Sequence, residues 1–421
     1  MNNVRSSKWL LAVFVWAGAG AALMAQSSPV LTTIYNFPGG SGGANSEAAP
    51  LASHNGILYG TTNNGGTRNM GIVYSLTPPT SPGEEWTGTV LYKFNGKDGA
   101  RPAGTLIFGP KGQLYGATSG KPAYAGDTDA VVFMLKPPAK SGGAWHNTVL
   151  YDFGEGPTSN VTAGSGGILY GSTAAEKSLN DGTVFSLTPP ASAGGSWAES
   201  TLYTFTEGPG GYNPQGQVAI GHDGLIYGAA GSGGAYNAGA VFALRPPASA
   251  GDPWTESAIY SFTDGHNGSL DGSAPLNLVS SATGVLYGMT ASGGAGNYGT
   301  VFSLTPPSQA GGAWTEEVLH SFAYGDGTDP YTTANLLIDG DGIVYGTVPT
   351  GGTYGFGAVF SLTPPASTGG AWTYTILHAF TDGSDGGYPY SGLAYGPGGL
   401  IYGTTAGGGA FGDGTVFSLQ P

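Results

Sequence analysis

Residues 286–322 read LYGMTASGGAGNYGTVFSLTPPSQAGGAWTEEVLHSF, and most of this stretch recurs along the chain. A Tyr-Gly pair ends an apolar run seven times, with successive copies 55 to 60 residues apart: Tyr59, Tyr115, Tyr170, Tyr227, Tyr287, Tyr345 and Tyr402. Each copy continues with a Gly-rich stretch, a Val-aromatic-x-Leu run, a Pro-Pro turn and a Tyr/His-x-Phe run. A fixed period of about 57 residues indicates a repeat architecture.

Each repeat supplies four short β-rich runs and no stretch of helical period. The runs are a Trp-led segment ending in Tyr/His-x-Phe, a weaker Pro-x-x-x-Leu segment, Leu/Ile-Tyr-Gly and Val-Phe-Ser-Leu. Four strands per unit are typical of a propeller blade. A solenoid would need terminal repeats with a polar outer face, and neither end of the sequence has one. The sequence therefore predicts an all-β, seven-bladed β-propeller with four-stranded blades.

The Trp-led segment shows how the ring closes. Trp residues precede six of these segments: Trp86, Trp145, Trp197, Trp254, Trp314 and Trp372. The seventh segment is Leu31–Phe37 near the N-terminus, and the sequence stops at Pro421, directly after the last Val-Phe-Ser-Leu run. We expect Leu31–Phe37 to pair with Val416–Leu419, because sharing one blade between the two ends removes the unpaired edges of an open array. The Trp residues, at a fixed place in each blade, are expected to pack between blades.

Composition narrows the class of function. Of 421 residues, 79 are Gly and 29 are Pro, a share that would indicate disorder in a sequence without a period. With no Cys, the chain has no disulfide, thiolate nucleophile or Cys-type zinc site. A net charge of −14 argues against nucleic-acid and anionic-membrane partners.

Residues 1–25 have the pattern of a secretory signal. Arg5 and Lys8 precede the apolar stretch Trp9–Met24, and Ala25 provides a small residue before the expected cleavage point. A retained membrane anchor is the alternative, although the stretch is near the lower length limit for a span. We expect residues 26–421 to form one exported, monomeric propeller, secreted or periplasmic, that has no membrane contact after cleavage.

The repeat resembles the GloVer-type tandem repeat of exported bacterial proteins. The matching elements are Leu-Tyr-Gly-Thr-Thr-x-x-Gly-Gly and Gly-Thr-Val-Phe-Ser-Leu-Thr-Pro-Pro with its following Trp-Thr-Glu, nearly complete at Leu58–Gly66 and Gly299–Glu316. The resemblance covers about residues 31–421 and implies no enzymatic activity. The order of runs is also similar to that of kelch blades, which would place the Pro-x-x-x-Leu strand innermost and the Trp-led strand outermost.

With that strand order, the loops after Tyr-Gly and those after Tyr/His-x-Phe share one face of the ring. These loops are rich in aromatic and acidic residues, and sugars combine apolar faces that stack on rings with hydroxyls that suit carboxylates. A binding face for glycans or cell-surface partners is the expectation. Its candidate ligand-binding residues are Tyr236, Tyr298, Tyr354, Phe411, Asp264, Asp326, Asp382 and Asp385. The competing interpretation is that the Asp-Gly pairs are simply turn formers.

Catalysis and metals have weaker signals. A glycoside hydrolase or polysaccharide lyase using loop carboxylates is the alternative function; a catalytic site normally breaks repeat symmetry, and the most divergent loop is Thr118–Asp129. Asp382 to Asp385 could bind calcium but lacks the EF-hand order. His320 and His378 occupy the Tyr slot and are expected in the core, and the other His residues have no metal-ligand spacing. We expect no cofactor, no metal and a non-catalytic binding module.

Overall fold

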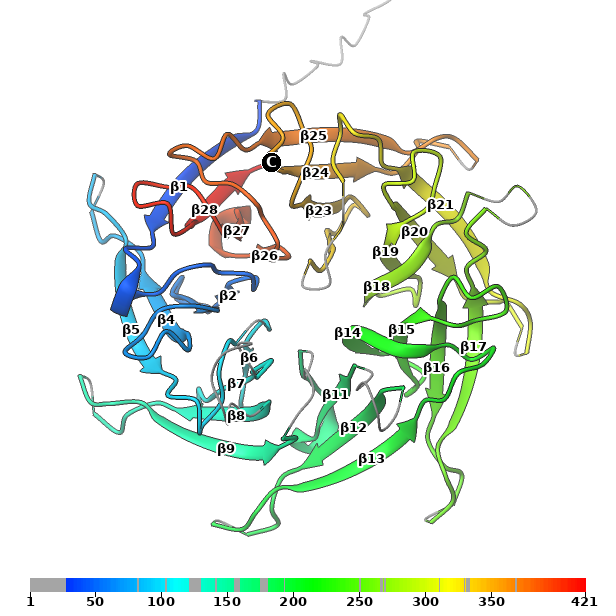
Figure 1. Ribbon diagram of the computed structural model, residues 1–421, viewed down its shortest axis with the longest axis horizontal. Helices are drawn as coiled ribbons and strands as arrows, with labels where there is room; N and C mark the ends of the chain where they lie inside the picture. Colours follow the sequence, from blue (N-terminus) through cyan, green and yellow to red (C-terminus); the bar gives the residue numbers. More distant parts are fainter. Residues whose placement is uncertain are drawn as a thin grey trace, which may run out of the picture.

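A computed structural model describes residues 28–421, apart from 82, 103, 121–129, 141, 155–159, 175–180, 193, 250, 266–267, 269, 310, 329, 331–333 and 368 (Figure 1). Over this part of the chain, seven four-stranded antiparallel sheets form a ring, which confirms the predicted propeller. The predicted signal sequence, Met1–Ala25, lies outside the described residues. Among the residues described, no helix is long and apolar enough to span a membrane.

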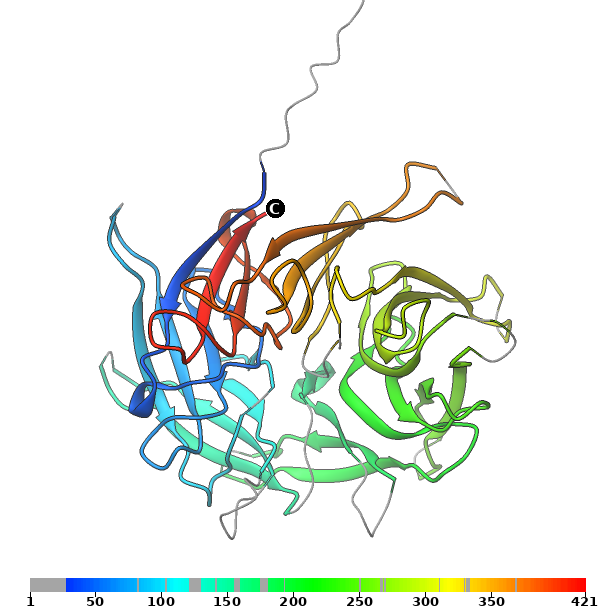
Figure 2. The same cartoon turned by 45° about the horizontal axis from the view of Figure 1, so that its top comes forward.

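Every blade has the same strand order from the axis outward, as Figures 1 and 2 show. The innermost strands are β2 (Leu51–Ala52), β6 (Ile107–Phe108), β10 (Thr162–Ala163), β14 (Tyr212–Ile220), β18 (Ser273–Ser280), β22 (Leu337–Ile338) and β26 (Ala394–Tyr395). The second strands are β3 (Leu58–Thr62), β7 (Leu114–Ala117), β11 (Leu169–Thr173), β15 (Ile226–Ser232), β19 (Leu286–Ser292), β23 (Val344–Val348) and β27 (Ile401–Thr405).

The third strands are β4 (Ile72–Thr77), β8 (Val131–Lys136), β12 (Thr183–Thr188), β16 (Ala240–Arg245), β20 (Thr300–Thr305), β24 (Ala358–Thr363) and β28 (Thr415–Gln420). The outermost strands are β5 (Thr87–Lys93), β9 (His146–Asp152), β13 (Ala198–Thr204), β17 (Thr255–Ser261), β21 (Thr315–Ser321), β25 (Thr373–Ala379) and β1 (Val30–Asn36). Blade 1 comprises β2–β5, the next five blades follow in order, and blade 7 combines β26–β28 with β1. Three short 3₁₀ helices are also described: η1 (Gly40–Gly42), η2 (Ser165–Gly167) and η4 (Pro397–Gly399).

The N-terminal strand closes the ring as predicted. β1 pairs antiparallel with β28, with Leu31 opposite Leu419 and Asn36 opposite Thr415. The ends of the described chain therefore meet within one sheet (Figure 1). Blade 7 thus gains an outermost strand that β26–β28 alone would lack.

Aromatic side chains join each blade to the next. The Phe of Tyr/His-x-Phe in one blade packs against the aromatic residue of Val-aromatic-x-Leu in the following blade. The rings of Phe380 in blade 6 and Phe417 in blade 7 have centroids 5.4 Å apart. The rings of Phe37 in blade 7 and Tyr74 in blade 1 have centroids 5.1 Å apart, which completes the ring of contacts. Both faces of a blade are consequently covered, which explains why the third strands are buried along their length without polar alternation.

The Trp residues make a second contact between blades, as expected. Trp145 of blade 2 packs edge-on against Tyr59 of blade 1, and Trp314 of blade 5 packs in the same way on Tyr227 of blade 4. The Gly of each Tyr-Gly pair lies under an aromatic ring of the third strand. A Cβ added to Gly288 would lie 2.6 Å from Cζ of Phe302, so this position accepts no side chain without displacing the ring.

The closing strand should contribute as much stability as a strand inside the repeat array. Phe37 in blade 7 and Phe380 in blade 6 are both fully buried at equivalent positions. We expect Phe37→Ala and Phe380→Ala each to lower the free energy of unfolding by about 3–5 kcal/mol, measured by denaturant unfolding. Val30→Ala on the same strand is the control, because Val30 is 58% exposed. A Phe37→Ala variant as stable as that control would contradict closure through β1.

Candidate functional site

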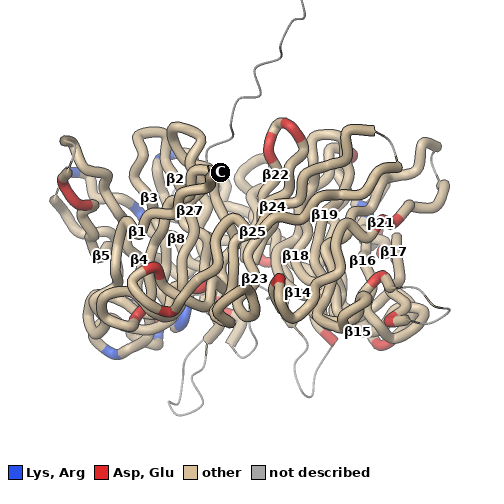
Figure 3. The backbone as a smooth tube through the Cα atoms, turned by 90° about the horizontal axis from the view of Figure 1, so that it is seen from above, with Lys and Arg blue, Asp and Glu red and all other residues tan. Residues whose placement is uncertain are grey.

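The antiparallel order divides the turns between two faces of the ring. One face carries the Gly-rich loops between second and third strands together with the connections from each outermost strand to the next blade. The opposite face carries the Pro-Pro turns and the turns between innermost and second strands. We call these the Gly-loop face and the Pro-Pro face. Viewed edge-on in Figure 3, acidic residues are found on both faces and are not gathered into one patch.

The Gly-rich loops have one conformation in blades 1, 4, 5, 6 and 7. In blade 5, Gly293, Gly294, Asn297 and Gly299 all have positive φ, between 60° and 90°. The loop is closed by the backbone bond from Gly299 N to Gly293 O at 3.1 Å, and Asn297 Oδ1 accepts a further bond from Gly293 N at 3.2 Å. Asn and Gly are the residues that tolerate left-handed backbone, so the sequence of the loop specifies its shape.

The residue between these fixed points differs from blade to blade. The fourth loop position holds Arg68, Tyr236, Gly296, Tyr354 and Phe411 in blades 1, 4, 5, 6 and 7. Of these, Tyr236 is 43% exposed, Tyr354 59% and Phe411 63%, so the loops present three large rings to solvent. A side chain on such a loop has an ordered backbone before any contact is made, which lowers the entropy cost of binding.

Tyr298 differs from the other three predicted aromatic residues. It lies two positions further along its loop, is half-buried, and packs against the core between blades 5 and 6. Its ring is 6.3 Å from that of Tyr324, which belongs to the connection after β21 and is 74% exposed. The exposed ring of blade 5 therefore comes from Tyr324, with Tyr298 beside it.

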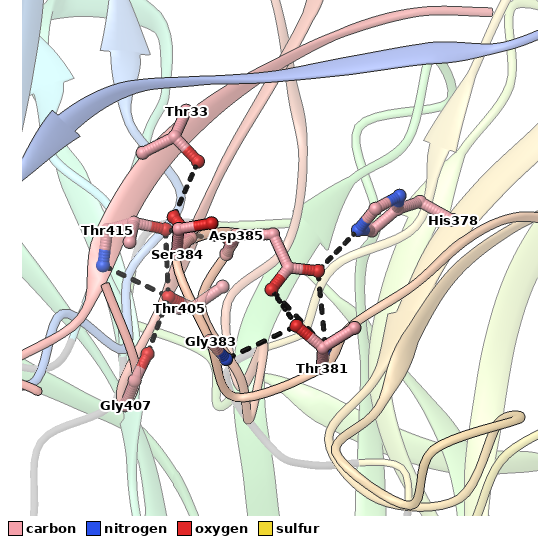
Figure 4. A network of polar contacts seen from close by, with 9 residues as sticks. All are labelled: Thr33, His378, Thr381, Gly383, Ser384, Asp385, Thr405, Gly407 and Thr415. Atoms are coloured by element: carbon pink, nitrogen blue, oxygen red, sulfur yellow. Dashed lines mark hydrogen bonds and ion pairs between the residues drawn. The ribbon is translucent and has the colours of Figure 1, made fainter. Parts of the chain in front are cut away.

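The predicted acidic residues fall into two pairs. Asp264 and Asp382 are exposed, have positive φ of 46° and 57°, and precede Gly in turns. The carboxylates of Asp326 and Asp385 instead accept hydrogen bonds from residues of their own connecting loops and of the preceding strand. Figure 4 shows Asp385 accepting hydrogen bonds from the backbone N–H of Thr381 at 3.1 Å, from its hydroxyl, and from Nε2 of His378 at 3.0 Å. Asp326 accepts bonds from Ala323 N at 2.7 Å and His320 Nε2 at 2.8 Å.

The expectation that His320 and His378 are core residues is wrong. Both side chains are partly exposed, at 18% and 27%, because the Tyr slot lies at the end of the outermost strand next to the connecting loop. Burial lowers the pKa of His320 below its ordinary value, and Asp326 opposes this shift. Burial alone would raise the pKa of the Asp385 carboxyl, but hydrogen bonds from Thr381 and His378 outweigh it and leave the pKa below its usual range.

The same carboxylate clamp recurs where the slot holds Tyr. Tyr92 donates to Asp98 at 2.5 Å, and Tyr260 donates to Asp271 at 2.8 Å. Sequence reasoning singled out the Asp residues but missed the partner in the Tyr slot. The available signal was an Asp that follows four of the seven Tyr/His-x-Phe runs at a short but variable distance. These clamps fasten the connections between successive blades.

Two further carboxyl groups escaped the sequence analysis. Glu256 and Glu316 follow Trp-Thr on β17 and β21 and lie against Tyr203 and Tyr260 of the preceding blades. Burial raises the pKa of each carboxyl to about 7, and the neighbouring Asp271 and Glu317 contribute to the shift of Glu316. Oε1 of each Glu has no hydrogen-bond partner among the described residues.

These raised pKa values predict that stability falls as pH rises. The unfolded chain releases both protons near pH 4.5, whereas the folded chain holds them until about pH 7. The contribution is therefore fully present below pH 4.5 and is lost as pH rises through 7. We expect the double variant Glu256→Gln, Glu316→Gln to have a melting temperature that changes less between pH 5 and 8 than that of the unsubstituted protein. At pH 8 its melting temperature should be the higher of the two. Glu85→Gln, at an exposed turn, is the control, and an unchanged pH profile in the double variant would refute the assignment.

A groove on the Pro-Pro face separates blades 4 and 5. It encloses about 670 Å³ and is lined by Asp223, Tyr227, Arg245, Gln309 and Trp314 among others. A second hollow of about 250 Å³ shares Asp223, Tyr227 and Trp314 with it. The candidate residues expected from the sequence do not include any on this face. Within the described residues, no group of three or more His, Asp or Glu residues is arranged to hold a metal ion.

The divergent loop Thr118–Asp129 lies mostly outside the described residues, which resume at Ala130.

The repeat itself decides the family. The family described as the Gloeobacter/Verrucomicrobia repeat matches residues 18–242, 191–333 and 251–421, which together span nearly the whole chain. The chain belongs to this repeat family. The resemblance to GloVer-type repeats is thereby confirmed. A comparison with curated proteins found no match.

Several solved structures share the fold at low sequence identity. The extracellular domain described as part of a hybrid two-component system from B. thetaiotaomicron has a TM-score of 0.55 and 12% identity, covering 93% of this chain and 42% of that chain. A second structure of a B. thetaiotaomicron extracellular domain, described as belonging to a one-component system, has a TM-score of 0.53 and 12% identity, with the same coverage. The chain thus spans about two-fifths of the length of these proteins.

The GH93 α-L-arabinofuranosidase of Fusarium graminearum, solved with arabinobiose, has a TM-score of 0.47 and 13% identity, covering 92% of this chain and 97% of that chain. At 12% identity, the likeness to the two B. thetaiotaomicron domains shows the fold alone.

Proposed function

We propose that the chain is an exported, monomeric and non-catalytic binding protein that holds glycans on its Gly-loop face. The predicted signal sequence supports export to the extracellular or periplasmic space. The observation that carries the binding role is the set of exposed rings on rigid loops of neighbouring blades: Tyr236, Tyr324, Tyr354 and Phe411. Exposed rings on loops that are already ordered lose little conformational freedom when a ligand binds, which favours binding.

Glycans fit this face better than an apolar partner does. The rings are spread one per blade and are not joined into a continuous apolar patch, so each can stack on one sugar while the intervening surface stays polar. Asp264 and Asp382 expose carboxylates on the same face that can accept hydrogen bonds from sugar hydroxyls. Tyr298 supports the ring of Tyr324. Asp326 and Asp385 keep the connections in shape and contribute indirectly.

The alternative, a glycoside hydrolase or lyase with loop carboxylates, has less support from the site. Asp326 and Asp385 are already bonded within their loops. Glu256 and Glu316 have the raised pKa of a general acid but do not line the groove or hollow between blades 4 and 5. They pack against Tyr203 and Tyr260 of the preceding blades.

The proposal is tested with a glycan array followed by calorimetry on the glycans retained. We expect Tyr354→Ala and Phe411→Ala each to weaken binding about two- to tenfold, because ring stacking contributes about 0.5–1.5 kcal/mol. Tyr395→Ala is the matched control, since Tyr395 is 38% exposed and lies next to a turn of the Pro-Pro face.

Two results would overturn the proposal. One is that the folded protein retains no glycan on the array. The other is that both Gly-loop variants bind as tightly as the control. Product release from the same polysaccharides, followed by reducing-sugar assay, would instead support the enzymatic alternative.

A further inference from the structure

A second binding surface lies on the opposite face of the ring, in the groove between blades 4 and 5. One wall is formed by the turn before β15 and by Ser257–Ile259 of β17, and the other by the Pro-Pro turn of blade 5. Trp314 and Tyr227 both line the groove and pack edge-on, with ring centroids 5.6 Å apart at 67°. The groove therefore combines an aromatic wall with polar groups on both sides.

The aromatic residues of the groove belong to the repeat, but the positive charge of Arg245 does not. Contacts of the Trp314–Tyr227 kind recur at other blade junctions, for example between Trp86 and Tyr402. The residue at the end of the third strand, Arg245 in blade 4, varies between blades. The equivalent residues are Thr77, Lys136, Thr188, Thr305, Thr363 and Gln420. Since Thr serves this strand end in four blades, the fold does not require an arginine at this position.

Gln309 is a second departure from the repeat in the same groove. Four other blades place Ser at this point of the Pro-Pro turn, at Ser81, Ser192, Ser249 and Ser367. The turn depends on the backbone alone, because Gln309 O accepts a bond from Gly312 N at 3.1 Å, as Ser367 O does from Gly370 N at 3.1 Å. The longer amide side chain is exposed at the groove. Two departures that the fold does not need thus converge on one cavity.

Arg245 is available for an anionic ligand. Its side chain is exposed and makes no hydrogen bond or ion pair with any residue that the structure describes. On the same blade, Asp223 accepts hydrogen bonds from Tyr227 OH at 2.7 Å and from Leu225 N at 3.1 Å, which hold it in place. A guanidinium matches a carboxylate through two parallel bonds, while a fixed carboxylate retains lone pairs for hydroxyl groups.

We propose that this groove binds a sugar that carries one carboxylate within an otherwise neutral glycan. The carboxylate would pair with Arg245, the ring hydroxyls with Asp223 and Gln309, and the apolar face of the sugar with Trp314. The ligand class rests on the proposed function, but the site, the face and the charge requirement are separate from it. Screening at ordinary ionic strength limits repulsion from the net charge of −14, so the local guanidinium sets the preference.

A peptide is the less favoured occupant. β17 is the outermost strand of its sheet and could pair with an extended chain, but so could the outermost strand of every other blade. The side chains that depart from the repeat at this junction are Arg245 and Gln309, and Asp223 lines the same groove. These suit a compact polyhydroxylated acid better than a peptide backbone.

The test measures calorimetric binding of two matched probe pairs to the full-length folded protein. The pairs are aldotetraouronic acid with neutral xylotriose, and 3′-sialyllactose with lactose. We expect at least one acidic probe to bind at least tenfold more tightly than its neutral counterpart. Arg245→Thr, which installs the residue of other blades, should weaken that binding about ten- to a hundredfold, the loss of a charged hydrogen-bonded pair.

Controls separate this site from the Gly-loop face. Lys136→Thr removes a cation at the equivalent strand end of blade 2 and should leave acidic-probe binding unchanged. Tyr354→Ala should also leave it unchanged, so loss of binding in that variant alone would assign the acidic glycan to the Gly-loop face. Failure of both acidic probes, equal binding by Arg245→Thr, or tighter binding of acetyl-Gly-Leu than of either sugar would overturn the inference.

Discussion

The aromatic contact between neighbouring blades is the interaction on which the molecule depends. Twelve Phe residues are less than 2% exposed, and they lie at the two repeat positions that meet across blade junctions. Burying each side chain is worth about 1.5–3 kcal/mol, so no blade is stable without a neighbour on each side. A linear array would leave its two end blades with one such face open. Closure through β1 is therefore a requirement of the packing, since Phe37 supplies the ring that Tyr74 would otherwise lack.

These contacts also account for the unusual composition. A ring packed over each Tyr-Gly pair excludes a side chain from that Gly, as Phe302 does above Gly288. The loops that follow need left-handed backbone at four points, which again selects Gly or Asn. Because the backbone fixes the shape of these loops, the residue at the fourth position can vary from Arg68 to Phe411 without affecting the fold. The fixed backbone thus makes these loops rigid and also allows the residue at the fourth position to vary.

The period of the sequence predicted the fold, because the four runs recur along the chain, and the closing strand, because the Trp-led run of one blade is found at the N-terminus. The strand order was expected from the similarity to kelch blades. The period predicted less of the site. The clamps of Asp326 and Asp385 depend on which side chain occupies the Tyr slot, and short Asp-Gly motifs do not distinguish a clamp from an open turn. Arg245 and Trp314 lie 69 positions apart and meet only because two blades adjoin. Comparing equivalent positions between repeats does not predict which residues of different repeats line the same groove.

A repeat protein separates the residues that build it from those that distinguish one copy from another. Positions held constant, such as the buried aromatic residues and the loop Gly, are explained by packing and backbone geometry. Positions that vary on exposed, rigid supports have no such explanation, and they lie on two different faces here. Tyr354 and Phe411 differ from Arg68 on one face, and Arg245 and Gln309 differ from Thr and Ser on the other. Ring closure holds both sets of residues in fixed positions, so side chains on the two faces can change independently without changes to the shared core.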